Sequence, residues 1–283
     1  MKISDLKLKT KINIATIALL ILIFSSLGIT IYQSGKKNIS REIDERMVSH
    51  LNDLFVILQD HVAGKQNLVN ISMTLANSLF YGTGKLVEKD TNISVPGIDQ
   101  ITKQEKMYTI PIWEINGKEL YQNTEIVDLI KEKSVETATI FQKIEDGYLR
   151  IATNVLKNDG QRAVGTYIPN SSEVVQTIER GQTYYGRAYV VNDWYLTAYQ
   201  PIQINGIVKG MLYVGVKEKD YQFLKNVFSN KSYFSGYPFL VSKTGDFIIH
   251  PSKEKENFSQ ANFFKQLISA KENEYKSKYK WPE

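Results

Sequence analysis

The chain has 283 residues, 42% of them hydrophobic and 11% aromatic, which suffices for one large domain or two small ones and excludes wholesale disorder. Its formal net charge of +5 is small, and its basic residues are interspersed with acidic ones, which argues against a nucleic-acid partner. The absence of cysteine excludes thiol catalysis, disulfide bonds and cysteine-bound zinc.

Histidine offers no metal site either. Of the three histidines, His50 and His61 are about three helical turns apart, so they share a helix face but cannot chelate one ion. We expect both, and His250, in ordinary surface or interface positions. The sequence therefore predicts neither a metal nor a cofactor.

An uncharged apolar segment lies near the N-terminus. Residues 12–34 carry no charge and are bracketed by Lys11 and Lys36. About 20 residues rising ~1.5 Å each cover a bilayer core of roughly 30 Å. A cleaved signal peptide is the alternative, but it calls for a shorter apolar region and a small-x-small cleavage site, for which Gly28-Ile29-Thr30 is a weak candidate. We predict a retained transmembrane helix over residues 12–33.

The basic residues on the two sides of this segment bear on its orientation. Four lysines precede the segment, and Lys36, Lys37, Arg41 and Arg46 follow it. The positive-inside rule counts only lysine and arginine, so the two sides are nearly level, with a slight preference for a cytoplasmic N-terminus. We predict residues 1–11 in the cytoplasm, one span through the lipid of the inner membrane, and an extracytoplasmic remainder.

Residues 34–80 are predicted to form one long helix. Apolar residues recur mostly in steps of three and four, and no proline interrupts them. This stripe consists of Ile43, Met47, Leu51, Leu54, Leu58, Val62, Leu68, Ile71, Leu75 and Leu79. A helix of ~45 residues reaches roughly 65–70 Å, longer than a small domain is wide. We therefore predict that residues 39–80 form a rod that pairs with a second copy in a homodimer.

The periodicity then changes to two, which indicates strands. A loop is predicted over residues 81–106, followed by strands Met107–Ile115 and Glu119–Tyr121 around the turn Asn116-Gly117. A short helix is expected from Asn123 or Thr124 to about Lys131. Turn residues then separate further strands, predicted at Thr137–Ile144, Tyr148–Val155, Gln161–Ile168, Tyr184–Val191, Trp194–Pro201 and Ile207–Val216. Another helix opens at Ser171-Ser172-Glu173 and closes at Gly181.

This order predicts an α+β fold, with a PAS-like antiparallel sheet over residues 81–220 that packs one face on the long helix and leaves the other free for a ligand cavity. A second unit is predicted over residues 221–283. Its elements are a connecting helix at Asp220–Ser235, strands at Tyr237–Gly245 and Asp246–Pro251, a helix from Asn262 to about Lys271, and a further strand at Tyr275–Trp281. Because so few strands cannot close a sheet around a core, we expect this unit to be incomplete.

Several runs of residues occur in the order typical of the extracytoplasmic Cache family of bacterial sensors. The runs are Thr137–Gln142, Tyr148–Val155, Asp159–Tyr167, Arg180–Tyr189, Trp194–Ile202 and Val208–Val216. Residues 236–240, with Gly245 and His250-Pro251, resemble the opening of a second Cache unit. The chain thus resembles the fused Cache 3/Cache 2 type over about residues 34–283, and it departs from the pattern in the truncated second unit.

The resemblance implies a periplasmic small-molecule sensor, usually carried by a methyl-accepting chemotaxis protein and sometimes by a histidine kinase or a cyclase. Residues 1–11 are also similar to the start of chemotaxis receptors. Because a fold does not fix function, the choice of a chemotaxis receptor rests on resemblance alone. We predict extracytoplasmic sensing by a transmembrane signal-transduction receptor that is not an enzyme.

The strands from Tyr184 to Pro201 carry most candidate ligand-binding residues. If Asn192-Asp193 is the hairpin turn, Gly186 faces Tyr199, and such pairs place small residues beside hydroxyl groups. The opposite face holds Arg187 among aromatic side chains, which suits a carboxylate because guanidinium donates two parallel hydrogen bonds to it. Arginines on adjacent strands could add positive charge. The candidate ligand-binding residues are Arg150, Arg162, Arg187, Tyr189, Tyr195 and Tyr199. The alternatives are arginines that are solvated or paired with acids and tyrosines that only pack in the core.

A membrane-anchored enzyme and an adhesion scaffold are the alternatives from other classes. An enzyme would need a nucleophile with a base, or a pair of carboxylates in a pocket. The sequence contains no Gly-x-Ser-x-Gly and no His-Glu-x-x-His, and its one candidate base near the sheet, His250, is followed by proline. A scaffold would need no pocket, so ligand binding discriminates between a scaffold and a sensor.

Overall fold

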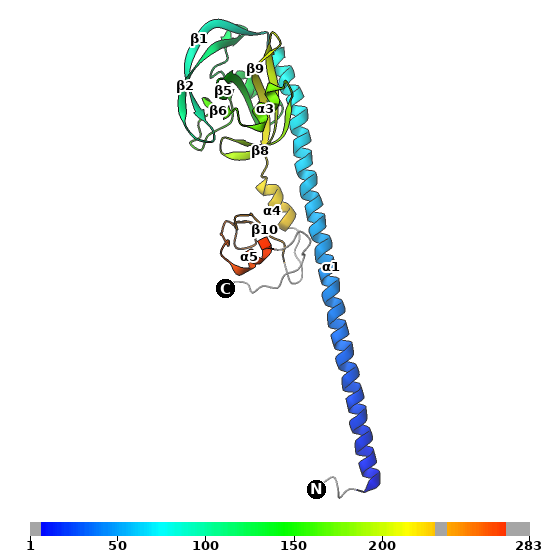
Figure 1. Ribbon diagram of the computed structural model, residues 1–283. Coiled ribbons are helices and arrows are strands. Elements are labelled where there is room, and N and C mark those ends of the chain that lie inside the picture. Colours follow the sequence, from blue (N-terminus) through cyan, green and yellow to red (C-terminus); the bar gives the residue numbers. More distant parts are fainter. Residues whose placement is uncertain (1–6, 230–236, 270–283) are drawn as a thin grey trace. The chain divides into compact units, whose positions relative to one another are not determined.

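The structure, a computed structural model, describes residues 7–229 and 237–269. The chain divides into two compact units, Leu58–Phe258 and a smaller unit that combines Met1–Ile57 with Ser259–Glu283. Helix α1 (Leu8–Gly82) is continuous, so the predicted transmembrane helix and the predicted long helix are one element (Figure 1). The predicted strand at Tyr275–Trp281 lies outside the described residues.

The smaller unit contains the apolar part of α1. From Ile12 to Tyr32 the large apolar side chains are exposed on every side of the helix, including the consecutive residues Leu19, Leu20 and Ile21. Among the described residues, α1 is the helix that is long and apolar enough to cross a membrane. The unit also holds α5 (Asn262–Ser269), which buries Phe263 and Phe264.

The larger unit is a sheet of nine strands with short helices, as an α+β fold requires. In chain order the strands are β1 (Leu86–Asp99), β2 (Glu105–Ile115), β3 (Lys118–Glu119), β4 (Thr137–Ile144), β5 (Gly147–Thr153), β6 (Thr166–Pro169), β7 (Tyr184–Val190), β8 (Asp193–Ile204) and β9 (Ile207–Lys217). In space their order is β3-β2-β1-β6-β5-β4-β9-β8-β7. The helices are α2 (Glu125–Lys133), α3 (Glu173–Glu179) and α4 (Tyr221–Ser229), and a separate pair of strands, β10 (Leu240–Val241) and β11 (Phe247–Ile249), follows.

Strand β1 corrects the predicted loop over residues 81–106. The strand was not predicted because it contains Pro96 and Gly97, and both residue types are rare inside a sheet. Pro96 is tolerated because β1 pairs along its length with β2, whereas it pairs with β6 only at Ile98 and Asp99. The β1–β6 pair is parallel, so the sheet is mixed and not wholly antiparallel as predicted. Strand β6 is also shorter than predicted.

Of the hairpin turns predicted at Asn116-Gly117 and Asn192-Asp193, the first is confirmed and the second is shifted. Asn116 and Gly117 have φ of 52° and 74°, and Asn205 and Gly206 have φ of 52° and 78°, the left-handed conformation of tight hairpin turns. Between β7 and β8 the turn is formed by Val191 and Asn192 instead of Asn192 and Asp193, and Gly186 consequently pairs with Thr197. The turn moves by one residue, which changes each cross-strand partner by two residues. Each side chain therefore keeps the face that the sequence predicts.

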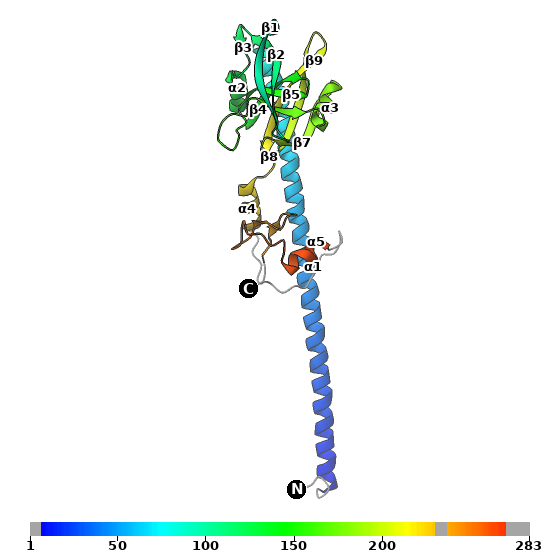
Figure 2. The same cartoon turned by 60° about the vertical axis from the view of Figure 1, so that its left-hand side comes forward.

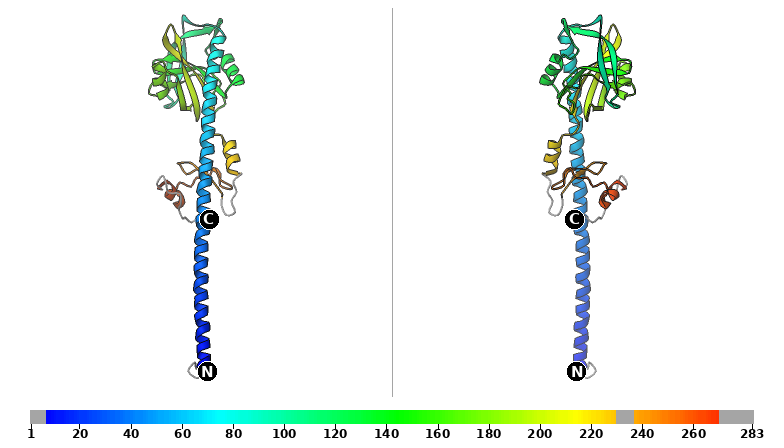
Figure 3. Two further views of the ribbon diagram at one scale, coloured as in Figure 1. Left: turned by 90° about the vertical axis from the view of Figure 1, so that its right-hand side faces the viewer. Right: turned by 90° about the vertical axis from the view of Figure 1, so that its left-hand side faces the viewer.

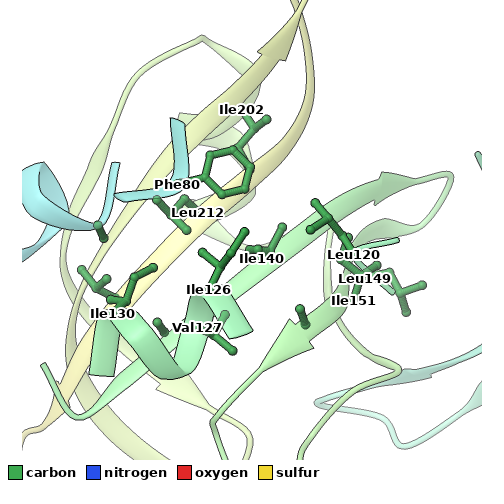
Figure 4. Close-up of a cluster of buried hydrophobic side chains, with 14 of the residues drawn as sticks. Phe80, Leu120, Ile126, Val127, Ile130, Ile140, Leu149, Ile151, Ile202 and Leu212 are labelled. Carbon is green, nitrogen blue, oxygen red and sulfur yellow. The ribbon is translucent and has the colours of Figure 1, made fainter. Parts of the chain in front are cut away.

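The two faces of the sheet are covered differently. Helices α1 and α2 cover one face, and α3 covers the other; Figure 2 shows α2 and α3 on opposite sides of the strands. On the first face Phe80 of α1, Ile126 and Ile130 of α2, and Leu212 of β9 meet in an aliphatic core (Figure 4). The part of α1 beside the sheet is seen from two sides in Figure 3.

Helix α1 has two apolar faces where it runs beside the sheet. The buried residues, at helical spacing, are Val69, Met73, Ala76 and Phe80. The predicted stripe is mostly a different set, since Leu68, Ile71 and Leu75 are 48%, 61% and 39% exposed. The sheet therefore covers one side of the helix and leaves Leu68, Ile71 and Leu75 of the predicted stripe on the surface, while Leu79 packs against the core.

Candidate functional site

The α3 face of the sheet is lined with hydroxyl-bearing side chains. Tyr184 pairs across the strands with Tyr199, and Tyr199 pairs in turn with Tyr213. Tyr213 continues the row to Thr139, which pairs with Thr153. A side chain at Gly215 would meet the Tyr213 hydroxyl group, so glycine leaves room for the phenol in this position. The row forms a polar floor, in contrast to the aliphatic face opposite.

A β-bulge brings Arg150 onto this floor. The register between β4 and β5 shifts, so that Ile140 pairs with Ala152 and Phe141 pairs with Arg150, and Ile151 is the extra residue. Bulges of this kind re-aim side chains and are common beside functional sites. The Arg150 guanidinium lies over the Phe141 ring, 4.8 Å from its centroid.

The guanidinium of Arg150 is completely buried, and within residues 7–229 and 237–269 no carboxylate balances its charge. The side chain is 0% exposed. Its Nη1 donates to Thr166 Oγ1, whereas Nε and Nη2 have no hydrogen-bond partner and no carboxylate influences the group among the residues described. Burial lowers the pKa of Arg150 to about 10, and Tyr199, Tyr213 and Tyr195 partly offset this effect. Arg150 is therefore still a cation at neutral pH, in a place where an isolated cation is costly.

A cavity of about 510 Å³ opens at the edge of the sheet next to this cluster. Its walls come from the end of β1, the start of α3, and strands β7 and β8. The lining residues are Gln100, Ile101, Lys103, Ile168, Ser171, Ser172, Glu173, Val174, Tyr184, Arg187, Ala188, Tyr189, Trp194 and Tyr199. Arg150 itself does not line the cavity, and Tyr199 is the residue common to the cavity lining and the surroundings of Arg150.

Arg187 lines the cavity but is already paired. Its Nε donates to Glu218 Oε1 over 2.6 Å, and its guanidinium lies 3.8 Å from the centroid of the Trp194 ring. Tyr189 packs edge-on against the same ring. Arg187 and Tyr199 come from opposite faces of the sheet, yet they meet in one cavity because β7 is the edge strand and no further strand separates the faces there.

The remaining predicted residues lie in two places. Tyr195 is buried on the α3 face near Arg150, and burial raises its pKa. Arg162 is not brought to the cavity: its two Nη atoms donate to the carboxylate oxygens of Asp128, each over 2.9 Å, and Nη1 also donates to Thr153 O.

Of the residues that line the cavity, the sequence pointed only to Arg187, Tyr189 and Tyr199. Tyr184, Trp194 and Tyr213 lie in predicted strands, and the same alternation that selected Tyr195 and Tyr199 would have found Tyr184 and Tyr213. Gln100, whose buried Oε1 has no partner, follows a strand that the sequence did not predict, so no signal pointed to it. In the part of the chain that the structure describes, no group of acidic and histidine side chains could hold a metal ion.

The long N-terminal helix followed by a mixed nine-strand sheet with helices is a Cache-like arrangement. Residues 32–283 match the model of the Cache 3/Cache 2 fusion domain, and the chain belongs to that family. The resemblance seen in the sequence is thereby confirmed. No curated protein matches the chain significantly.

Three solved structures are similar to parts of the chain. An extracellular domain assigned to the histidine kinase mmHK1S-Z2 is 19% identical over 46% of this chain and 58% of that one, with a TM-score of 0.26. The ligand-binding domain of the Pseudomonas aeruginosa PAO1 amino acid chemoreceptor PctB, in complex with L-Gln, is 22% identical over 44% and 50%, with a TM-score of 0.21. The ligand-binding domain of the Pseudomonas fluorescens chemoreceptor CtaA, in complex with L-serine, is 16% identical over 50% and 58%, with a TM-score of 0.21. The chain therefore spans between half and three fifths of these domains.

Proposed function

We propose that the chain is the extracytoplasmic sensing part of a transmembrane signal-transduction receptor, and that its ligand is a small molecule with a carboxylate or a similar anionic group. One observation carries the proposal: Arg150 is a fully buried cation whose Nε and Nη2 have no partner, and no acidic side chain pairs with it, among the residues that the structure describes. A ligand anion would supply the missing charge and accept the unmade hydrogen bonds.

Binding in this site would be coupled to movement. Nε and Nη2 of Arg150 are enclosed, so a ligand reaches them only when neighbouring side chains such as Tyr199 move aside. A receptor needs two states that differ in their affinity for the ligand, because a ligand shifts an equilibrium only by its differential affinity for the two states.

The receptor class that we favour is a methyl-accepting chemotaxis protein, with a histidine kinase or a cyclase as the alternative. Support for the chemotaxis class is the similarity of residues 1–11 to such receptors. We favour binding without catalysis, since the lining contains Ser171 and Ser172 with no histidine, and Glu173 as its one carboxylate.

A thermal-shift screen of the full chain in detergent tests the ligand proposal. Each carboxylate is compared with its own primary amide, as in acetate with acetamide and lactate with lactamide, and L-glutamine and L-serine are added as zwitterionic probes. We expect at least one carboxylate to raise the melting temperature while its amide does not, because a ligand of the folded state stabilises it. Equal stabilisation by an amide would contradict a site built for anions.

The second part of the proposal is the membrane anchor. The support is the stretch of α1 from Ile12 to Tyr32, whose apolar side chains are exposed all round the helix. Sequencing the N-terminus of membrane-extracted protein tests whether this stretch is retained. A mature chain that begins after residue 25 would contradict the anchor.

The third part is a homodimer formed along α1. Met47 and Leu51 of the stripe are each 49% exposed, whereas Leu54 is buried. Single cysteines at Met47 or Leu51 should form symmetric disulfides in membranes, since the chain contains no other cysteine. Ser49 lies on the opposite side of the helix from both, so Ser49→Cys is the matched control. Equal cross-linking at all three positions, or none at any, would contradict a homodimer that pairs through Met47 and Leu51.

A further inference from the structure

An ion pair connects the cavity to the segment through which the chain leaves the sheet. Arg187 lines the cavity, and its Nε donates to Glu218 Oε1 over 2.6 Å. Glu218 follows the last residue of β9, and its own backbone N–H donates to Trp194 O over 3.0 Å. The exit segment, residues 217–220, is therefore paired through Glu218 with a side chain that lines the cavity.

The same exit segment is held by α1. Lys65 Nζ donates to Lys217 O over 3.1 Å and lies 3.5 Å from a carboxylate oxygen of Asp220. His61 Nε2 lies 3.4 Å from that oxygen, and the His61 ring stacks on Phe223 with centroids 3.6 Å apart. Helix α1 thus contacts both ends of the four-residue segment, and Arg187 of the cavity lining pairs with Glu218 between them.

Asp220 also starts helix α4. Its Oδ1 accepts a hydrogen bond from Phe223 N over 3.0 Å, and its carbonyl accepts one from Leu224 N over 3.0 Å. The Phe223 hydrogen bond lowers the pKa of Asp220, and Lys65 and His61 lower it further. Displacing Asp220 would therefore loosen the first turn of α4 and its contact with α1 together.

We propose that Arg187 passes occupancy of the cavity to α1: an anionic ligand group competes with Glu218 for the guanidinium and releases the exit segment from His61 and Lys65. A bidentate carboxylate replaces the single hydrogen bond from Nε, and its charge repels Glu218. Replacing Glu218 by the ligand carboxylate should change the free energy little, because Arg187 is half exposed and exposed ion pairs are weak. This inference rests on the proposed function, since it needs an anion in the cavity.

The coupling can be tested without a ligand, by amide hydrogen exchange at residue resolution on the full chain in nanodiscs. Arg187→Gln removes the ion pair at a half-exposed side chain, so we expect the variant to fold. The amides of Glu218, Phe223 and Leu224 should exchange about fivefold faster than in the parent protein. Lys209→Gln is the matched control, because it removes the pair with Glu88 (3.2 Å) at the other end of β9 and should leave the three amides unchanged.

A change confined to Glu218, or no change at all, would overturn the inference, because the effect must reach the first turn of α4. Glu218→Gln should reproduce the effect, and the double variant should add nothing, as expected for residues that act as one pair. The ligand screen is separate. Coupled exchange without stabilisation by any carboxylate would leave the connection standing and refute the proposed ligand class, whereas the reverse result would refute the connection alone.

Discussion

The two faces of the sheet are built for different purposes. The face under α1 and α2 is aliphatic and aromatic, with Phe80, Ile140 and Leu212 in one continuous core. The face under α3 carries a row of tyrosines and threonines and the buried cation Arg150. The buried side chains of the first face form one apolar core, whereas the second face leaves Nε and Nη2 of Arg150 without partners. Under the proposed function, the first face stabilises the domain and the second gives up stability for binding.

The largest effect is expected on the first face. Phe80 is fully buried, so Phe80→Ala should lower the free energy of unfolding by about 3–5 kcal/mol through lost burial and a residual cavity. Urea unfolding followed by circular dichroism measures this loss. Affinity for a stabilising carboxylate should stay within about twofold under conditions where the variant is folded. A folded Phe80→Ala protein with no affinity would show that the two faces are not separate in function.

On the second face the expected effects are reversed. Arg150→Met should weaken carboxylate binding by about 2–3 kcal/mol, roughly 30- to 150-fold, which isothermal titration can measure. The same change should leave the free energy of unfolding unchanged or raise it, because an apolar side chain replaces an uncompensated charge. A large loss of stability, with binding intact, would make Arg150 a structural residue. Arg187→Ala should cost less affinity, since Glu218 already partners Arg187.

The sequence was sufficient for most of the frame and for part of the site. Turn residues such as Asn116-Gly117 and Asn205-Gly206 located the strands, because few residues adopt positive φ. Alternation placed Tyr195 and Tyr199 on one face even though the turn was assigned one residue late. By contrast, the partner of Arg162 lies 34 residues away in α2, and the partner of Arg187 lies 31 residues away after β9. Such long-range pairs decide which arginine remains free, and no local pattern encodes them.

The Arg162–Asp128 pair tests what an arginine does when its charge is matched. Both side chains are more than one-third exposed, so Arg162→Gln should lower the free energy of unfolding by only about 0.5–1 kcal/mol. Affinity for the carboxylate should not change, since the pair lies outside the cavity. Asp128→Asn is the matched variant, and thermal unfolding together with titration compares the two. Loss of binding in either variant would extend the site beyond the cavity.

The smallest expected effect lies outside both faces, at His250. Its Nδ1 accepts hydrogen bonds from the backbone N–H groups of Ser252 and Lys253, over 3.1 and 3.0 Å, which requires an unprotonated nitrogen. Burial, followed by the charge of Lys253, lowers the pKa of His250, while Glu256 and Glu254 act in the opposite direction. The unfolded chain therefore binds a proton more readily than the folded one, so stability present above about pH 6.5 is lost as the pH falls below it.

Acid should consequently loosen residues 237–258 before it affects the sheet, whose buried arginine and tyrosines titrate far above neutral pH. Limited proteolysis at pH 7 and pH 5 measures this difference. In His250→Asn an amide oxygen can accept the same backbone hydrogen bonds without titrating, so the variant should be cleaved at similar rates at both pH values. If the variant and the parent protein share one pH dependence, another group is responsible, and the local acid sensitivity of His250 is excluded.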